Sequence, residues 1–138
     1  MTIYARERKT TAIQYIVTVQ KLQVEILSYV MKDKYFPKKY RYILVQDIMN
    51  KANELADNVI GSNSVFPNTE ERLSLRKRYL DRAIINCRQL ENKFLLACRV
   101  IKEVTPESLK NITGLLLEEI GLLKNTLKNT KLIEQQKD

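Results

Sequence analysis

Cations and aromatic rings are interleaved in one short stretch of the sequence, and together they suit chemistry with a polyanion. Residues 32–41 contain five lysines or arginines, and the rings within or beside them are Tyr35, Phe36, Tyr40 and Tyr42. Lysine and arginine bind phosphate, and exposed rings stack on nucleic-acid bases. The pattern therefore predicts a nucleic-acid contact. The alternative is that the rings fasten a turn to the hydrophobic core, which is the role we favour for Phe36.

The sequence gives little indication of catalysis. The chain has no histidine, so it lacks the commonest metal ligand and the usual general base near neutral pH. Two acidic pairs are present, and solvated or ion-paired carboxylates explain them better than a metal site does: Asp47 with Asp57, and Glu118 with Glu119. We therefore expect no enzymatic activity, no metal and no cofactor. The missing histidine also argues against an RNA-cleaving toxin.

Positive charge is concentrated in two parts of the chain. The net charge is +8, and residues 1–42 hold nine cations and three acids, while residues 70–104 hold nine cations and five acids. In a helical bundle, the ends of these two stretches would meet at one pole. The nucleic-acid-binding cations expected in this region are Lys38, Lys39, Arg41, Arg88, Lys93 and Arg99. A second basic pole would contain Arg72, Arg76, Lys77 and Arg78.

Surface ion pairs are the simpler explanation for individual cations. Arg88 and Glu91 have the i,i+3 spacing of such a pair. Lys77 and Asp81 have the i,i+4 spacing. For the basic surface as a whole, the alternatives to nucleic acid are an acidic protein partner and a membrane surface. A membrane is the weaker of these alternatives, because the apolar faces are needed for the core and for partners.

Four helices are predicted from the apolar periodicity and from the residues that interrupt it. Pro37, Gly61 with Pro67, and Pro106 separate the periodic segments. We expect helices near 12–33, 39–60, 69–103 and 106–133.

The apolar residues of each predicted helix recur in alternating steps of three and four residues, and we call such a row a seam. The seam residues of the third helix are Leu80, Ala83, Cys87, Leu90, Phe94, Ala97, Ile101 and Val104. The second contributes Val45, Ile48, Ala52, Leu55 and Val59. The fourth contributes Leu109, Ile112, Leu116, Ile120, Leu123 and Leu127, and the first Ile16, Val19, Leu22, Ile26 and Val30.

Local capping signals mark two of the predicted helix starts. Asn68 and Glu71 have the spacing of a capping box. Thr105 followed by Pro106 fits an N-cap followed by the first helical residue. Short turns between long helices favour antiparallel neighbours, so the fold class is all-α, an up-down-up-down antiparallel four-helix bundle.

The length of the chain predicts a single domain. The bundle is expected at 12–133, after a basic N-terminal arm at 1–11 and before a disordered tail at 134–138. Cys87 and Cys98 are eleven residues apart on one predicted helix. That spacing is about 16 Å, too far for a disulfide, so we expect free thiols. With no secretory leader and no apolar run that could span a membrane, the expected location is cytoplasmic.

A second set of apolar residues lies off the main seams. Its members are Met49, Ile84, Ile85, Leu95, Leu96, Leu115 and Leu122. These positions favour a homo-oligomer, because a monomer would leave some of them exposed. Broad core-facing helices explain them nearly as well.

Two segments of the sequence resemble the Avd-like family of four-helix-bundle proteins. The stretch "LSYVMKDKYFPKKYRYILVQDIMNKANELADNVI" is similar to the family's Phe-Pro-Lys turn, its basic-aromatic entrance and its second helix. The stretch "VTPESLKNITGLLLEEIGLLKNTLK" is similar to its last helix, with an Ile-Gly-x-Leu-Leu-like element at 120–123. The similarity spans roughly residues 15–128. It departs in the loop "GSNSVFPNTEE" and in the N-terminal "YARERK".

The resemblance implies a function as well as a fold. Avd is the accessory variability determinant of diversity-generating retroelements, and such proteins form basic homopentameric barrels. They bind nucleic acid and the element's reverse transcriptase, which copies template RNA into mutagenised cDNA, and they perform no chemistry themselves. Pro37, Lys38, Lys39 and Arg41 match the family's basic entrance, and Lys93 matches a cation on the third helix, with Arg88 about one turn earlier.

A related family offers an alternative function. Proteins encoded in intervening sequences of 23S ribosomal RNA share the bundle and the pentamer. The resemblance therefore also allows an RNA-binding or protein-interaction scaffold without a retroelement role.

Overall fold

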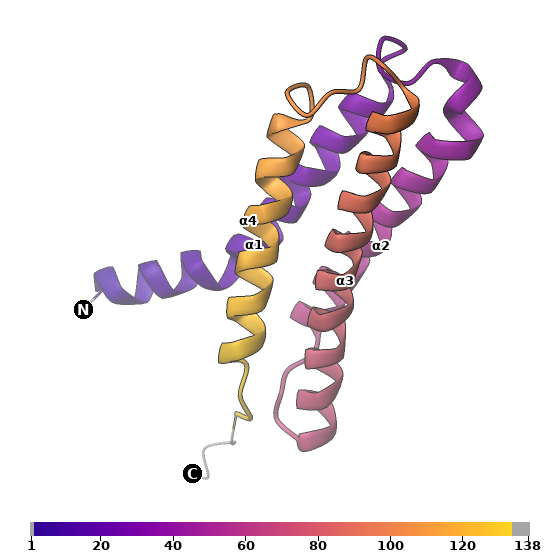
Figure 1. Cartoon of the computed structure of the whole chain (residues 1–138). Coiled ribbons are helices and arrows are strands. Elements are labelled where there is room, and N and C mark those ends of the chain that lie inside the picture. The colour runs from indigo at the N-terminus through magenta and orange to yellow at the C-terminus, as the bar shows by residue number, and fades with distance from the viewer. Residues whose placement is uncertain (1, 134–138) are drawn as a thin grey trace, which may run out of the picture.

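Four α-helices make up the fold, and the described part of the chain contains no β-strand (Figure 1). The computed structural model describes residues 2–133, with side chains described from residue 13 onward. The prediction of an all-helical four-helix bundle is confirmed. The α-helices are α1 (Thr2–Val30), α2 (Gln46–Ser64), α3 (Glu70–Val100) and α4 (Lys110–Asn129). Two short helices precede α2: a 3-10 helix, η1 (Lys38–Tyr40), and a π-helix, η2 (Arg41–Val45).

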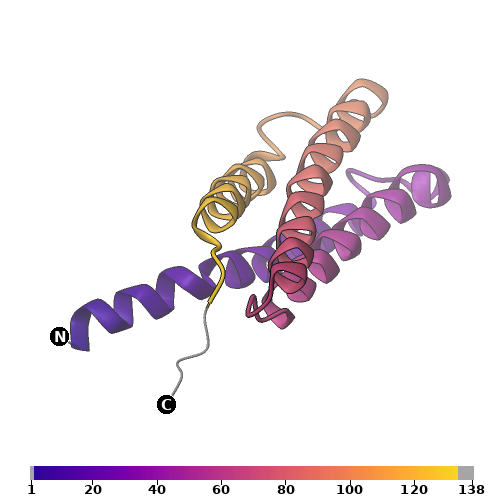
Figure 2. The same ribbon diagram turned by 90° about the horizontal axis from the view of Figure 1, so that it is seen from below.

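The outer ends of α1 and α4 differ from the expected boundaries. α1 begins at Thr2 rather than near residue 12, so the stretch expected to be an arm continues the helix. This first part of α1 runs away from the other helices in both views (Figures 1 and 2). α4 ends at Asn129, and the chain then turns so that the Ile133 N–H donates to the Pro67 carbonyl at 2.8 Å. The tail expected at 134–138 lies outside the described residues.

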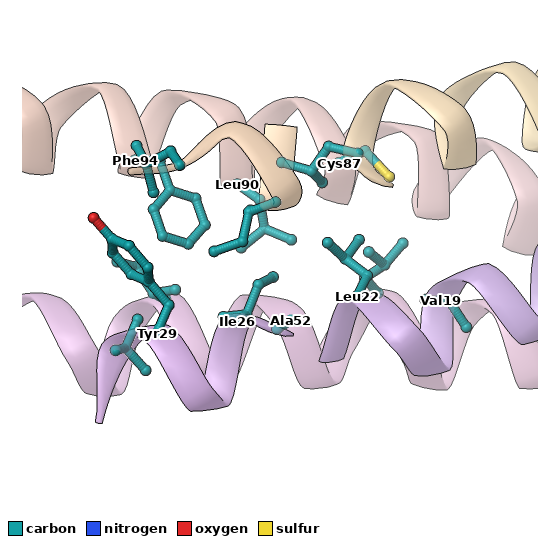
Figure 3. Close-up of a cluster of buried hydrophobic side chains, with 14 of the residues drawn as sticks. Val19, Leu22, Ile26, Tyr29, Ala52, Cys87, Leu90 and Phe94 are labelled. Atoms are coloured by element: carbon teal, nitrogen blue, oxygen red, sulfur yellow. The ribbon is translucent and has the colours of Figure 1, made fainter. Parts of the chain in front are cut away.

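The predicted seams form the hydrophobic core. Every seam residue of the second and third predicted helices is buried, and so are those of the other two except Ile16 and Leu127, which are half-buried. Figure 3 shows α1 side chains such as Leu22 and Ile26 directed toward Leu90 of α3. Apolar spacing of three and four residues places these side chains on one stripe of each helix, and burying the stripes together stabilises the bundle.

The caps differ in detail from the sequence prediction. Thr69, not Asn68, caps α3, and its Oγ1 accepts from the Arg72 N–H at 3.1 Å. The predicted capping box is therefore wrong by one residue, and Asn68 Oδ1 is buried without a hydrogen-bond partner. Near α4 the predicted cap residue, Thr105, does form a cap. Its Oγ1 accepts from the Ser108 N–H at 3.1 Å, but this turn precedes the start of α4 at Lys110.

The chain reverses at two ends of the bundle. The α1–α2 and α3–α4 connections lie at the same end, and the α2–α3 connection lies at the other (Figure 1). We call the first end, residues 31–43 and 99–109, the basic-aromatic pole, and residues 65–78 the far pole. None of the described helices is long and apolar enough to cross a membrane.

Candidate nucleic-acid interface

Tyr29 anchors the basic-aromatic pole to the core. Its ring stacks on Tyr35 with centroids 4.2 Å apart and 8° between the planes. It also meets the Phe36 and Phe94 rings edge-on, at 6.0 and 6.4 Å. These four rings join the end of α1, the following turn and α3. Aromatic pairs of this geometry stabilise a fold by about 0.5–1.5 kcal/mol beyond area burial.

The Tyr29 hydroxyl ties the same cluster to the α3–α4 connection. It lies 2.7 Å from Ser108 Oγ, which itself donates to the Thr105 carbonyl at 2.8 Å. Because the Ser108 proton is used there, Tyr29 is the donor. Burial raises the pKa of the Tyr29 hydroxyl, which keeps that proton in place.

This anchoring separates the four rings that the sequence grouped together. Phe36 is buried, as favoured from the sequence, and Tyr35 is half-buried against Tyr29. Tyr40 is half-buried, and Lys39 Nζ lies 5.2 Å from its ring centroid. Tyr42 alone among the four is exposed, with 82% of its surface accessible. Three of the rings therefore build the pole, and one is free to bind.

The cations around the exposed ring are also free. Lys38, Lys39 and Arg41 are exposed, and none of them is in an ion pair among the side chains that the structure describes. Lys38 and Lys39 lie in η1 and Arg41 begins η2, so the three cations and Tyr42 fall within five consecutive residues. A short helix of this kind holds its exposed residues close together, which concentrates positive potential next to an aromatic face.

Two of the predicted site cations are paired with carboxylates instead. Lys93 Nζ lies 2.5 Å from Asp47 Oδ2, linking α3 to α2. Arg88 Nη1 lies 3.1 Å from Glu91 Oε1, the surface pair that its spacing allowed. A carboxylate partner lowers the positive potential that each cation offers to phosphate. Both residues also lie on the part of α3 that precedes the pole.

Arg99 completes the pole from α3. Asp47 of α2 lies beside Lys93 of α3, and these helices run in opposite directions. Six residues back from Asp47 is Arg41, and six residues on from Lys93 is Arg99, so the two arginines reach about the same level. Arg99 is exposed. The structure thus brings four of the six predicted cations to one end.

The far pole uses its arginines differently. Arg72 Nε donates to the Phe66 carbonyl at 3.0 Å, and Arg76 Nη1 donates to the Val65 carbonyl at 3.2 Å. These bonds hold the α2–α3 connection. Lys77 and Arg78 remain exposed, and the described ion pairs do not include Lys77 with Asp81. Of the four predicted cations, Arg76 is half-buried, and Arg72 is exposed but uses its Nε to hold the connection.

The carboxylates of the two acidic pairs lie in different environments. Asp47 is ion-paired and Asp57 exposed, as expected. Glu118 is exposed, but Glu119 is buried, and neither of its carboxyl oxygens has a hydrogen-bond partner. For Glu119 the expectation of a solvated or paired carboxylate is wrong. Across the described residues, no group of three or more cysteine or acidic side chains could hold a metal ion.

The cysteines are free thiols, as predicted. Cys87 is buried and Cys98 half-buried, both on α3. Burial raises the pKa of the Cys87 thiol to about 12, which leaves it protonated and unreactive.

Sequence reasoning missed two features of the site. Tyr29 was not grouped with the other rings, although it lies one turn after Ile26, beside the seam residue Val30, and is buried. The Asp47 partner of Lys93 is 46 residues away in the sequence, so no local spacing signals it.

Comparison with protein-family models, with curated proteins and with solved structures gives no match to this chain.

Proposed function

We propose that this chain is a non-catalytic basic accessory protein that binds nucleic acid at the basic-aromatic pole. The observation that carries the proposal is the group of exposed, unpaired cations on η1 and η2 beside an exposed ring. Cations spaced this closely gain affinity by releasing counterions from the phosphate backbone. Contacts of this kind position a strand without reading its sequence, so we expect little sequence preference.

The resemblance to the Avd-like family supplies the biological setting of the proposal. In that setting the chain holds template RNA or cDNA for a reverse transcriptase, which performs the polymerisation in a diversity-generating retroelement. A gene for such an enzyme beside this one, with paired template and variable repeats, would support this setting. An isolated gene within ribosomal RNA would support the intervening-sequence scaffold instead.

We propose further that the helices alternate in direction, as an up-down-up-down bundle, and that five copies assemble into a barrel. Several large apolar side chains support self-association, because they are exposed on the single chain: Val24, Ile85, Leu95, Leu96 and Leu117. An open groove between α1 and α4 is lined by apolar and charged side chains, among them Val24 and Leu115. Assembly would place several weak sites on one particle, which raises the overall affinity for a long strand.

Charge reversal at the pole tests the proposed function. A variant with Lys38→Glu, Lys39→Glu and Arg41→Glu should bind a labelled RNA at least about a hundredfold more weakly in fluorescence anisotropy, because three attractive contacts become repulsive. Circular dichroism should show unchanged helicity, since all three side chains are exposed.

A matched control changes the same amount of charge at the opposite end. Lys124→Glu, Lys128→Glu and Lys131→Glu alter exposed residues of α4 and the segment after it. Affinity should fall only by the smaller amount that long-range electrostatics produces. Equal losses in the two variants would show that binding is not localised at the basic-aromatic pole, and a wild-type protein that binds no RNA at low salt would overturn the proposed function.

A further inference from the structure

Tyr42 is the aromatic ring of the basic-aromatic pole that the fold does not use. The Tyr29 ring contacts the rings of Tyr35 and Phe36, and Tyr40 is covered in part. Tyr42 stacks on no other ring in the part of the chain that the structure describes, and it is 82% exposed. An exposed ring directly beside exposed cations has the composition of a base-stacking site, and that combination favours a binding role for Tyr42.

The backbone under Tyr42 is held in place. Tyr42 lies in the π-helix η2, whose last two residues, Leu44 and Val45, are buried in the core. The Gln46 N–H donates to the Arg41 carbonyl and closes the π-type turn. Single π-type turns occur often at functional sites. Here the turn keeps Arg41 and Tyr42 together on the solvent side.

We propose that Tyr42 stacks on an unpaired base while the neighbouring cations bind the flanking phosphates, so that this site takes single-stranded nucleic acid in preference to duplex. The inference rests on the proposed function and specifies its ligand. Base stacking on an aromatic side chain is tolerant of sequence, because every base presents a flat face.

The duplex is disfavoured for a physical reason. Inside a double helix, the neighbouring base pairs cover both faces of each base, and a ring can reach a face only after the stack is opened. In a single strand the bases can be splayed out and stacked on a protein ring without that cost. Phosphate contacts from Lys38, Lys39 and Arg41 are available to both forms, so Tyr42 is the residue that distinguishes them.

The neighbouring residue provides a matched control. Ile43 is exposed to a similar extent, at 69%, and lies on the same π-helix, but it has no aromatic face. An apolar protein partner would use both side chains, whereas base stacking uses only the ring. Comparing the two substitutions therefore separates the two kinds of partner.

The experiment measures binding of a labelled single-stranded RNA of about twelve nucleotides and of a blunt duplex of the same sequence. Tyr42→Ala should weaken single-strand binding about tenfold and change duplex binding less than about twofold. Tyr42→Phe should keep near wild-type affinity because the ring remains. Ile43→Ala should bind both forms as the wild type does.

The outcomes distinguish the inference from the proposed function. Wild-type protein that binds both forms equally, with no selective loss in Tyr42→Ala, would overturn the inference while leaving phosphate binding at the pole intact. Equal losses in Tyr42→Ala and Ile43→Ala would also overturn it. Wild-type protein that binds neither form at low salt would remove the proposed function together with the inference.

Discussion

Glu119 carries a carboxyl group in an environment that disfavours its charge. The side chain has no exposed surface, and both of its oxygens lack hydrogen-bond partners. Burial, with a smaller contribution from the Glu118 carboxylate, raises the pKa of Glu119 to about 8, from an ordinary value of 4.5. At neutral pH the group is therefore mostly protonated in the folded chain, although it would ionise in the unfolded chain.

The stability of the protein should fall as pH rises, because of this residue. Between pH 4.5 and 8 the folded chain retains a proton that the unfolded chain releases, so raising the pH favours unfolding. The loss amounts to a few kcal/mol over the range, on the order of 1 kcal/mol for each pH unit. Chemical denaturation at several pH values should show that Glu119→Gln removes this dependence and leaves the variant more stable than the wild type at pH 8.

The exposed neighbour is the control for that substitution. Glu118→Gln changes the same chemical group one residue away, where water solvates the charge. Its free energy of unfolding should follow the wild-type pH profile closely. If the Glu119→Gln and wild-type profiles ran parallel, the buried carboxyl group would not be the cause.

Tyr29 should contribute both its ring and its hydroxyl to stability. Tyr29→Phe keeps the stack on Tyr35 but removes the donor to Ser108, which should lower the free energy of unfolding by about 1 kcal/mol. Tyr35→Phe is the control, because the Tyr35 hydroxyl makes no hydrogen bond to the residues that the structure describes, and it should change stability by less than about 0.5 kcal/mol. Thermal denaturation of the two variants measures the difference, and equal effects would count against the Tyr29 hydrogen bond.

At the level of the helices, α2 and α3 pack closely where Gly61 meets Tyr79. A Cβ at Gly61 of α2 would lie 2.7 Å from the ring of Tyr79 on α3, which is closer than atoms in real structures come. Glycine here allows the two helices to pack with the ring between them. The same residue type at Gly121 of α4 meets nothing within 4 Å.

Alanine should therefore have opposite effects at these two glycines. Gly121→Ala should stabilise the protein by about 0.5–1 kcal/mol, since alanine is the better helix former. Gly61→Ala should destabilise it by about 1 kcal/mol or more, because the Tyr79 ring must move and overpacking exceeds the propensity gain. Urea denaturation should show a higher free energy of unfolding for Gly121→Ala and a lower one for Gly61→Ala. Stabilisation by both substitutions would show that the Tyr79 ring moves aside at little cost.

The helices could be predicted from the sequence because the residues that repeat with the apolar period are the ones buried in the core. Leu80, Leu90 and Ile48 sit at regular intervals, and all are buried. The 3-10 helix and the π-helix before α2 could not be predicted. Together they leave the apolar spacing almost unchanged, so the sequence pattern looks like that of a continuous α-helix. Capping was also ambiguous, since Asn68 and Thr69 are both good N-cap residues and only the path of the chain after Pro67 selects Thr69.

For the molecule as a whole, the cations of the site were predictable and their partners were not. Lys38, Lys39 and Arg41 are close in sequence, so their clustering needs no tertiary information. Whether a cation is free depends on residues brought near by folding, as Asp47 is to Lys93. The burial of Glu119 is likewise a tertiary effect, because its position in the sequence, beside another glutamate, is typical of a solvated face.

Self-association should be measurable on the purified protein. Light scattering should report a particle of about five subunits, and Leu95→Glu with Leu96→Glu should reduce its mass, because charges at these exposed apolar positions oppose close packing. Lys124→Glu is a control that changes charge at an exposed residue that was already charged. A clean monomer at micromolar concentration would remove the pentamer from the proposal.

The salt dependence of RNA binding tests the central claim most directly, since it counts the phosphates that the pole neutralises. A single strand of about six nucleotides that contacts Lys38, Lys39, Arg41 and Arg99 should give a slope of about −3 in log affinity against log salt concentration, and hence about a fiftyfold loss between 50 and 200 mM salt. Changing the first three residues together to alanine should reduce the slope to about −1. A slope that stays at its wild-type value in this variant would contradict phosphate binding by the basic-aromatic pole.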